Sequence, residues 1–190
     1  MTSVPVTTAT VVDAMTPAPD IRILRLKPDQ TVPYKAGQYV ELTFASHEPR
    51  AFSIANAPHG DFIEFHIRDA GHGGASTYAV RSLALGEKVS ISRTAFGDCT
   101  VERVTKGNSV LAIAGGLGIA PLKAVCEHMI ECGHDDGVFL YWGVREKKDL
   151  YLDKYLKTLA RPKKNKFVYK PLVGHAVGEV LLLGIAAHVG

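Results

Sequence analysis

The hydrophobic pattern of the chain changes near residue 104, and this change constrains the fold more than any other feature of the sequence. Before it, short segments rich in strand-forming residues are separated by Pro, Gly and Asp: 9–15, 21–26, 37–44, 50–56, 62–68 and 88–94. Within 62–68, Ile63, Phe65 and Ile67 alternate with polar residues, as in a strand with one buried face. Short strands with turns at this spacing predict an antiparallel sandwich or barrel.

After residue 104 the strands become continuous apolar runs, at 109–114, 137–143 and 166–173. Such runs are typical of parallel strands buried on both faces. Helical patterns lie between them, one ending near Cys132 and one over 149–160. The order strand, helix, strand, helix, strand predicts a doubly wound parallel sheet. We therefore expect a β domain over 1–104 and an α/β domain over 105–190, joined near Arg103–Gly107.

The first of these helices has two faces. Leu122, Val125, Met129 and Ile130 form an apolar stripe, and we expect it to lie on the sheet. The polar residues of the same helix are expected to face away from it: Lys123, Glu127 and Glu131.

Composition and charge exclude several classes of protein. A net charge of +3 with scattered Lys and Arg does not indicate a nucleic-acid-binding protein. The amino terminus has no signal-peptide pattern, and no apolar run has the length of a membrane span. The cysteines, Cys99, Cys126 and Cys132, form no CxxC pair, which predicts a reducing, cytoplasmic location with no disulfide framework and no iron–sulfur cluster. His128, Cys132 and His134 lack a further ligand, so we predict no metal site.

A glycine-rich turn, "GGLGIAP" (115–121), joins a predicted buried strand to a helix. In an open parallel sheet this is the edge at which ligands bind, and a helix start offers free N–H groups to a phosphate. Pro121 stands where the ordinary dinucleotide fingerprint has Gly or Ala, and no GKS or GKT follows, which argues against a nucleoside triphosphatase. A tight connection that binds nothing is the alternative for this turn taken alone.

The strand "RAFSIAN" (50–56) carries an arginine and a serine with no acidic residue inside it. Alone, these could be a surface arginine and a buried serine. A second cluster, "GHGGAST" (71–77), places three glycines beside Ser76 and Thr77 just before a predicted helix over 78–85. The glycine clusters at 71–77 and 115–121, together with the nearby Arg50, indicate an anionic, phosphorylated ligand shared between the domains.

On these motifs the sequence resembles the ferredoxin–NADP reductase superfamily, in which a flavin-binding barrel precedes a nicotinamide-binding α/β domain. The Arg-x-Tyr/Phe-Ser motif matches 50–53, the Gly-Gly-x-Ser motif matches 73–77, and Gly-Gly-x-Gly-Ile-Ala-Pro matches 115–121. "YWGVREKKDLY" (141–151) is similar to the segment that lines the adenosine half of the nucleotide. Among subgroups the chain resembles bacterial NAD(P)H–flavin reductases and oxygenase reductase components, over roughly residues 5–177.

The resemblance implies FAD, or FMN, as bound cofactor and NAD(P)H as hydride donor. Arg50 would pair with the flavin phosphate, Phe52 would pack beside the ring, and Ser53 would be the catalytic residue, directed at flavin N5. Arg145 next to Glu146 leaves NADH and NADPH both open. The implied cofactor-binding residues are Arg50, Ala51, Phe52, Ser53, His66, Ile67, Arg68, Gly73, Gly74, Ala75, Ser76, Thr77, Gly115, Gly116, Leu117, Gly118, Pro121, Gly143 and Arg145.

The carboxyl-terminal stretch departs from the family pattern. Where the family continues into a further strand and a Gly-Pro motif, this chain reads "GEVLLLGIAAHVG". We expect an incomplete nucleotide domain, with the apolar tail 180–185 forming an irregular strand or promoting self-association. Free flavin, ferric iron, a ferredoxin and an oxygenase are all compatible acceptors. The alternative function is a flavin-binding electron-transfer subunit that works with a partner protein.

Overall fold

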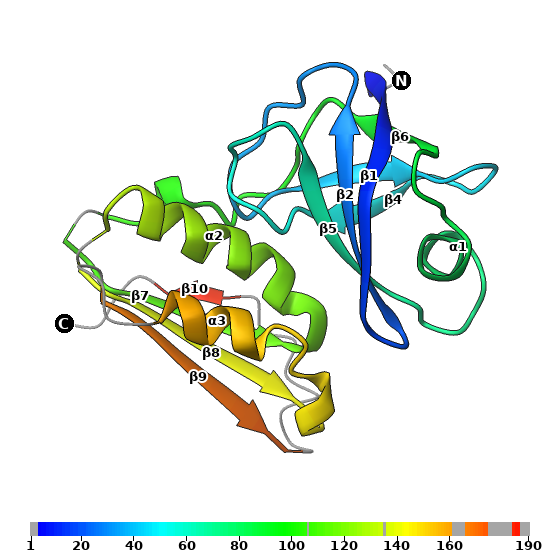
Figure 1. Ribbon diagram of the computed structural model, residues 1–190. Helices are drawn as coiled ribbons and strands as arrows, with labels where there is room; N and C mark the ends of the chain where they lie inside the picture. Colours follow the sequence, from blue (N-terminus) through cyan, green and yellow to red (C-terminus); the bar gives the residue numbers. More distant parts are fainter. Residues whose placement is uncertain (1–3, 106, 135, 161–165, 175–183, 187–190) are drawn as a thin grey trace.

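The computed structural model describes residues 4–105, 107–134, 136–160, 166–174 and 184–186, which fold into two sheets with α2 (Ile119–Glu131) between the second sheet and the first (Figure 1). The first sheet is antiparallel and has six strands in the order β4-β3-β6-β1-β2-β5. Its strands are β1 (Val6–Ala18), β2 (Ile21–Pro28), β3 (Tyr39–Thr43), β4 (Arg50–Ser53), β5 (Ile63–Arg68) and β6 (Lys88–Ser92).

The first sheet closes on itself where β4 meets β5. An isolated bridge pairs Ile54 with Phe65, and the Ala55 N–H donates to Glu64 O at 2.8 Å. Closure removes free sheet edges, and the apolar residues of the alternating strands fill the interior. Phe65 and Ile67 are in that core, as their alternation predicted. The expected antiparallel barrel is thus confirmed.

The helix after the glycine cluster begins earlier and is shorter than the sequence predicted. Helix α1 spans Ala75–Arg81 instead of 78–85, and its N-cap is Gly74. Ala75, Ala79 and Val80 are buried against the barrel, so packing rather than helix propensity sets its start. The chain then leaves the barrel through a short 3-10 turn, η1 (Val101–Arg103).

The second sheet contains three parallel strands, as predicted. They are β7 (Val110–Gly115), β8 (Val138–Val144) and β9 (Phe167–Val173), with β10 (Gly184–Ala186) added antiparallel at the β7 edge. The remainder of the apolar tail, residues 180–183, lies outside the described residues. The crossovers carry α2 and α3 (Asp153–Leu159), each preceded by a 3-10 turn, η2 (Gly116–Gly118) and η3 (Lys147–Asp149).

Within the described ranges both helices cover the same face of this sheet (Figure 1). Ala112 and Leu140, paired in register, are fully buried beneath them. On the opposite face Leu111 is half-buried and Ile113 is 42% exposed. The prediction that 109–114 is buried on both faces therefore holds for one face only. None of the helices in the described part of the chain is long and apolar enough to cross a lipid bilayer.

The helix predicted over 149–160 starts later than its hydrophobic pattern suggested. Residues 147–149 form η3, where the Glu146 and Asp149 side chains bond each other's backbone as a capping box. This box fixes a separate turn, and α3 begins only at Asp153.

Gly37 lies in a close contact with the end of the barrel domain and with α2. Its φ is +99°, and a Cβ there would lie 2.0 Å from Cys99 O and 3.2 Å from Val125 Cγ2 of α2. No side chain fits without moving the backbone that joins the two domains.

We expect Gly37→Ala to lower the free energy of unfolding by about 2–4 kcal/mol, from overpacking and an unfavourable φ. Urea unfolding followed by circular dichroism measures this. Gly60→Ala is the matched control, because Gly60 also has a positive φ, +84°, but open space around its Cβ position. Equal losses in the two variants would contradict the close contact.

Candidate functional site

A cavity of about 250 Å³ lies where the barrel meets the glycine turn. Strands β4 and β5 and helix α1 supply its barrel wall, and the start of the α/β domain supplies the other. Its lining residues are Ala51, Phe52, Ser53, His66, Ile67, Arg68, Ser76, Leu117 and Ala120. All but Ala120 were proposed from the sequence, so the fold brings residues from three separate motifs to one cavity.

Strand β4 presents its motif residues at this cavity. Its pairing with β3 sets Ser53 opposite Tyr39 and Phe52 opposite Val40. The Phe52 ring packs edge-on against Phe44, with centroids 5.6 Å apart, which fixes its orientation. Arg50 begins the strand, is exposed, and has no hydrogen-bond or ion-pair partner among the described residues. It is a free cation beside the cavity.

The glycine cluster at 71–77 is held by a buried carboxylate that sequence reasoning missed. Asp69 accepts from the Thr77 hydroxyl at 2.7 Å, from the Gly71 N–H at 2.8 Å and from Arg81 Nε. The Thr77 hydrogen bond, followed by that of Gly71, lowers the pKa of Asp69. Thr77 therefore shapes the loop through Asp69, whereas Ser76 lines the cavity. Open space adjoins Gly73 and Gly74, where a Cβ would meet no atom within 4 Å.

The glycine turn is anchored by the indole of Trp142. Trp142 Nε1–H donates to Gly116 O at 2.8 Å, and Gly116 has a φ of +50°, which favours glycine. Gly115 ends β7 opposite Gly143 of β8, so both lie at the carboxyl edge of the sheet, followed by exposed Arg145.

The same turn leads directly into α2. Gly118 caps the helix, and Pro121 is buried in its first turn. The turn and its helix thus place the start of α2 at the sheet edge predicted to bind a ligand.

Arg68 bridges the cavity and the glycine turn. A Cβ on Gly116 would lie 3.7 Å from Arg68 Nη1. Arg68 Nε is 3.0 Å from Asp20 Oδ2, yet it is buried without a properly oriented hydrogen bond in the described structure. Arg68 is therefore an ion-paired cation that lies between the cavity and the glycine turn.

His66 also lines the cavity, but both of its ring nitrogens are already engaged. Nε2 is 3.1 Å from Glu64 Oε1 and Nδ1 is 2.9 Å from the Tyr151 hydroxyl. Burial lowers the pKa of His66, so the ring is neutral, donating from Nε2 and accepting at Nδ1. The imidazole joins the two domains and is not free to bond a ligand.

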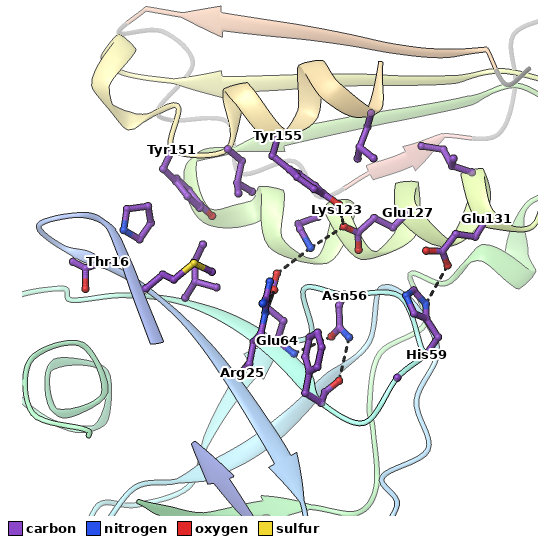
Figure 2. Close-up of a pocket in the computed structure, with 18 residues that line it drawn as sticks. Thr16, Arg25, Asn56, His59, Glu64, Lys123, Glu127, Glu131, Tyr151 and Tyr155 are labelled. Carbon is purple, nitrogen blue, oxygen red and sulfur yellow. Dashed lines mark hydrogen bonds and ion pairs between the residues drawn. The ribbon is translucent and has the colours of Figure 1, made fainter. Parts of the chain in front are cut away.

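Glu64 is the centre of a buried charge cluster between the domains (Figure 2). Its carboxylate is 2.9 Å from Arg25 Nε and 2.9 Å from Lys123 Nζ, and it accepts from His66. Burial alone would raise the pKa of Glu64, but the His66 hydrogen bond and the Lys123 charge outweigh burial and lower it to about 2.

The polar residues of α2 face away from the sheet as predicted, but they contact the barrel, and Lys123 is buried there while Glu131 stays partly exposed. Lys123 is 6% exposed and donates to Ala55 O at 2.9 Å, and Glu131 Oε2 is 3.1 Å from His59 Nδ1. The helical pattern identified the polar face, and only tertiary structure shows what covers it.

A larger cavity of about 650 Å³ adjoins this cluster (Figure 2). It shares no lining residue with the smaller cavity. Its charged groups pair with one another, as in Lys123–Glu127 at 2.8 Å. The smaller cavity, which combines residues of the sequence motifs and lies next to the unpaired side chain of Arg50, is therefore the candidate ligand site.

The residues of the smaller cavity fit the isoalloxazine end of a flavin and the loops beside it fit its phosphates. The cavity offers an aromatic ring, hydroxyl groups and the guanidinium of Arg68, and the Arg50 side chain next to it has no partner among the described residues. No group of three metal-ligating side chains occurs in the described ranges, and Cys132 Sγ lies 3.6 Å from His128 Nε2.

Comparison with known proteins assigns both halves of the chain. The family described as "Oxidoreductase FAD-binding domain" matches residues 8–97, and "Oxidoreductase NAD-binding domain" matches 112–179. The phenol hydroxylase P5 protein of Acinetobacter pittii is 33% identical over 165 residues, covering 86% of this chain and 46% of that protein. The NAD(P)H-flavin reductase of Aliivibrio fischeri is 34% identical over 153 residues, covering 74% and 61%.

Solved structures agree on the fold. A ferredoxin NADP+ reductase from Neisseria gonorrhoeae with bound FAD and NADP superposes with a TM-score of 0.80 at 21% identity, over 90% of this chain and 73% of that one. The chain spans about half the length of the curated relatives it matches. It covers 45% of a ferredoxin–NAD(P)(+) reductase component from Ralstonia and 61% of the Aliivibrio fischeri flavin reductase.

The lowered pKa of Glu64 predicts an acid-dependent loss of stability. Because its folded pKa lies below the ordinary value of 4.5, Glu64 stabilises the fold above pH 4.5 and loses this contribution as the pH falls toward 2. The free energy of unfolding, measured with urea, should fall more steeply from pH 5 to pH 3 for the wild type than for Glu64→Gln, whatever their absolute stabilities. Parallel pH profiles would contradict the assignment.

Proposed function

The chain belongs to the ferredoxin–NADP reductase-like superfamily, and from this membership we propose that it passes hydride from NAD(P)H to bound FAD and electrons on to an acceptor. The observation that carries the proposal is the cavity shared by the strand β4 motif and the glycine turn. It is supported by the two matched domain families, which bind FAD and a nicotinamide nucleotide. We propose a flavin domain over 1–104 and a nucleotide domain over 105–190.

The barrel side of the site would hold the flavin. Arg50 would pair with a flavin phosphate, since an exposed, unpaired guanidinium is suited to bidentate contact with phosphate oxygens. Gly73, Gly74 and Ser76 would offer backbone N–H groups and a hydroxyl to the same anion. Asp69 acts indirectly, since it holds the loop in place.

FAD, when bound, accepts hydride from the nicotinamide and releases electrons singly or in pairs. The protein residues would orient the flavin ring and shield it from water. Phe52, fixed by Phe44, would pack against the flavin ring, and the Ser53 hydroxyl would hydrogen-bond at N5. The remaining contribution is proximity, because the cavity walls come from both domains.

The α/β domain would hold the nucleotide. Gly115, Gly116 and Gly118 would let the nicotinamide approach, with Gly143 and Arg145 at the same edge. We favour NADPH. The Glu146 carboxylate that could bind a ribose diol is engaged in a capping box and lies 2.9 Å from Lys148 Nζ, whereas Arg145 has no partner among the described side chains.

The acceptor remains a choice among free flavin, ferric iron, a ferredoxin and an oxygenase component. The names of the relatives favour a redox protein of an oxygenase system or free flavin. Purified protein reduced anaerobically by NADH or NADPH should bleach at the oxidised flavin band, and turnover with free flavin, ferric citrate and a ferredoxin then ranks the acceptors. Flavin that binds but is bleached by neither nucleotide would instead indicate an electron-transfer subunit.

Arg50→Ala should raise the Kd for FAD roughly tenfold or more, since a charged hydrogen bond to the phosphate is lost. Isothermal titration calorimetry of the apoprotein measures this. Arg93→Ala is the matched control, because Arg93 is an exposed barrel arginine outside the cavity. An unchanged Kd for Arg50→Ala would remove Arg50 from the site.

Ser53→Ala should slow flavin reduction by NADPH roughly fivefold to tenfold, the worth of one hydrogen bond, with little change in FAD affinity. Stopped-flow absorbance under anaerobic conditions separates these quantities. A reduction rate equal to wild type would show that Ser53 does not act at the reacting atom.

A further inference from the structure

The polar residues of α2 form an interdomain stripe, defined as Lys123, Glu127 and Glu131, that contacts the segment directly after β4. Lys123 Nζ donates to Ala55 O at 2.9 Å, Glu127 Oε2 accepts from the Ala57 N–H at 3.4 Å, and Glu131 pairs with His59 at 3.1 Å. The helix residues are spaced by four and their partners by two.

The segment after β4 is not an extended strand, because the chain bends at Asn56 and Pro58 and the His59 N–H donates to Ala57 O at 2.8 Å. The stripe nevertheless contacts this segment at three successive points, which limits how far the helix can slide along the barrel. Figure 2 shows Lys123 and Glu127 directed from α2 toward the barrel.

Lys123 is the buried end of the stripe. Its ammonium lies within 3 Å of three acceptors: Ala55 O, Glu64 Oε1 and Glu127 Oε1. An ammonium has three protons, so its bonding capacity is filled. At the other end, the His59–Glu131 pair is exposed and contributes little.

The position of Lys123 relates it to both ligand-binding motifs. It is five residues after Gly118, so it lies about one and a half helical turns, roughly 8 Å, beyond the glycine turn. Its partner Ala55 is two residues after Ser53, and its partner Glu64 is two residues before His66. The ammonium thus joins the element that carries the glycine turn to the two strands that line the cavity.

A buried ion pair contributes little net stability to a fold, since the cost of desolvating the charges offsets much of their attraction. It does define geometry, because its charges tolerate few alternative positions. Hydride transfer requires reacting atoms about 3–3.5 Å apart, and a displacement near 1 Å can cost about a hundredfold in rate.

We propose that Lys123 is a positioning residue that sets the separation between the glycine turn and strand β4, and hence between nicotinamide and flavin. The inference rests on the proposed function for its kinetic consequence, but the interdomain geometry can be measured without ligands.

The geometric test is a distance measurement between spin labels on Cys132, exposed at the end of α2, and on Glu48→Cys in an exposed barrel loop. Cys99 is changed to Ser, and Cys126 stays unlabelled because burial raises the pKa of its thiol to about 12. Double electron–electron resonance should give a narrow distribution for wild type and Glu131→Gln, and a broadened or shifted one for Lys123→Met. An unchanged distribution overturns the proposal.

The double variant Lys123→Met with Glu64→Gln separates positioning from stability. It removes the carboxylate charge that Lys123→Met leaves buried, so its melting temperature should recover relative to the single variant while its distance distribution stays broad. If the melting temperature and the narrow distance distribution both recover, Lys123 contributes stability only, and the proposal fails. If the single variant does not fold, the distance distribution of the double variant alone tests the positioning role of Lys123.

The kinetic test follows flavin reduction by stopped flow, together with the long-wavelength charge-transfer absorbance of the nucleotide–flavin complex. We expect Lys123→Met to lose that absorbance and to be reduced roughly tenfold or more slowly, with the Kd for FAD unchanged, because no cavity residue is altered. Wild-type rate and absorbance in the variant would overturn the proposal. A wild-type protein that no nucleotide reduces would refute the proposed function, and the distance measurement would still decide the role of Lys123.

Discussion

The arrangement of the two domains depends on one buried carboxylate, that of Glu64. It receives Arg25 and His66 from its own barrel and Lys123 from the α/β domain, at 2.9, 3.1 and 2.9 Å. The two barrel partners hold the carboxylate in place, and Lys123 brings the α/β domain to the same buried charge, where few arrangements satisfy all of the groups. The cavity with the strand β4 motif on one wall and the glycine turn on the other lies beside this junction and shares His66 with it.

The polar character of this junction has a physical reason. Apolar surfaces pack in many similar ways, whereas hydrogen-bonded charges have few good geometries. Further contacts join the two domains, including the Tyr151 hydroxyl on His66 and the side chain of Val125 close to Gly37. Two small domains are thereby held at one spacing, which a shared ligand site requires.

The sequence was sufficient for the local features and insufficient for the tertiary ones. Periodicity identified the barrel strands, the parallel strands and the polar face of α2, because each depends on neighbours along the chain. It could not show that Lys123 contacts Ala55, or that His66 turns to Tyr151, because those partners are 68 and 85 residues away. Asp69 was missed for a related reason, since its link to Thr77 depends on a loop whose path only the fold defines.

Trp142 is the single tryptophan of the chain, and its indole N–H is bonded to the glycine turn. It is fully buried and packs edge-to-face against Tyr151, whose hydroxyl in turn contacts His66 of the barrel. The tryptophan fluorescence of the protein therefore comes from one site between the turn and the interdomain cluster. The chain carries an intrinsic optical probe of that junction, needing no added label.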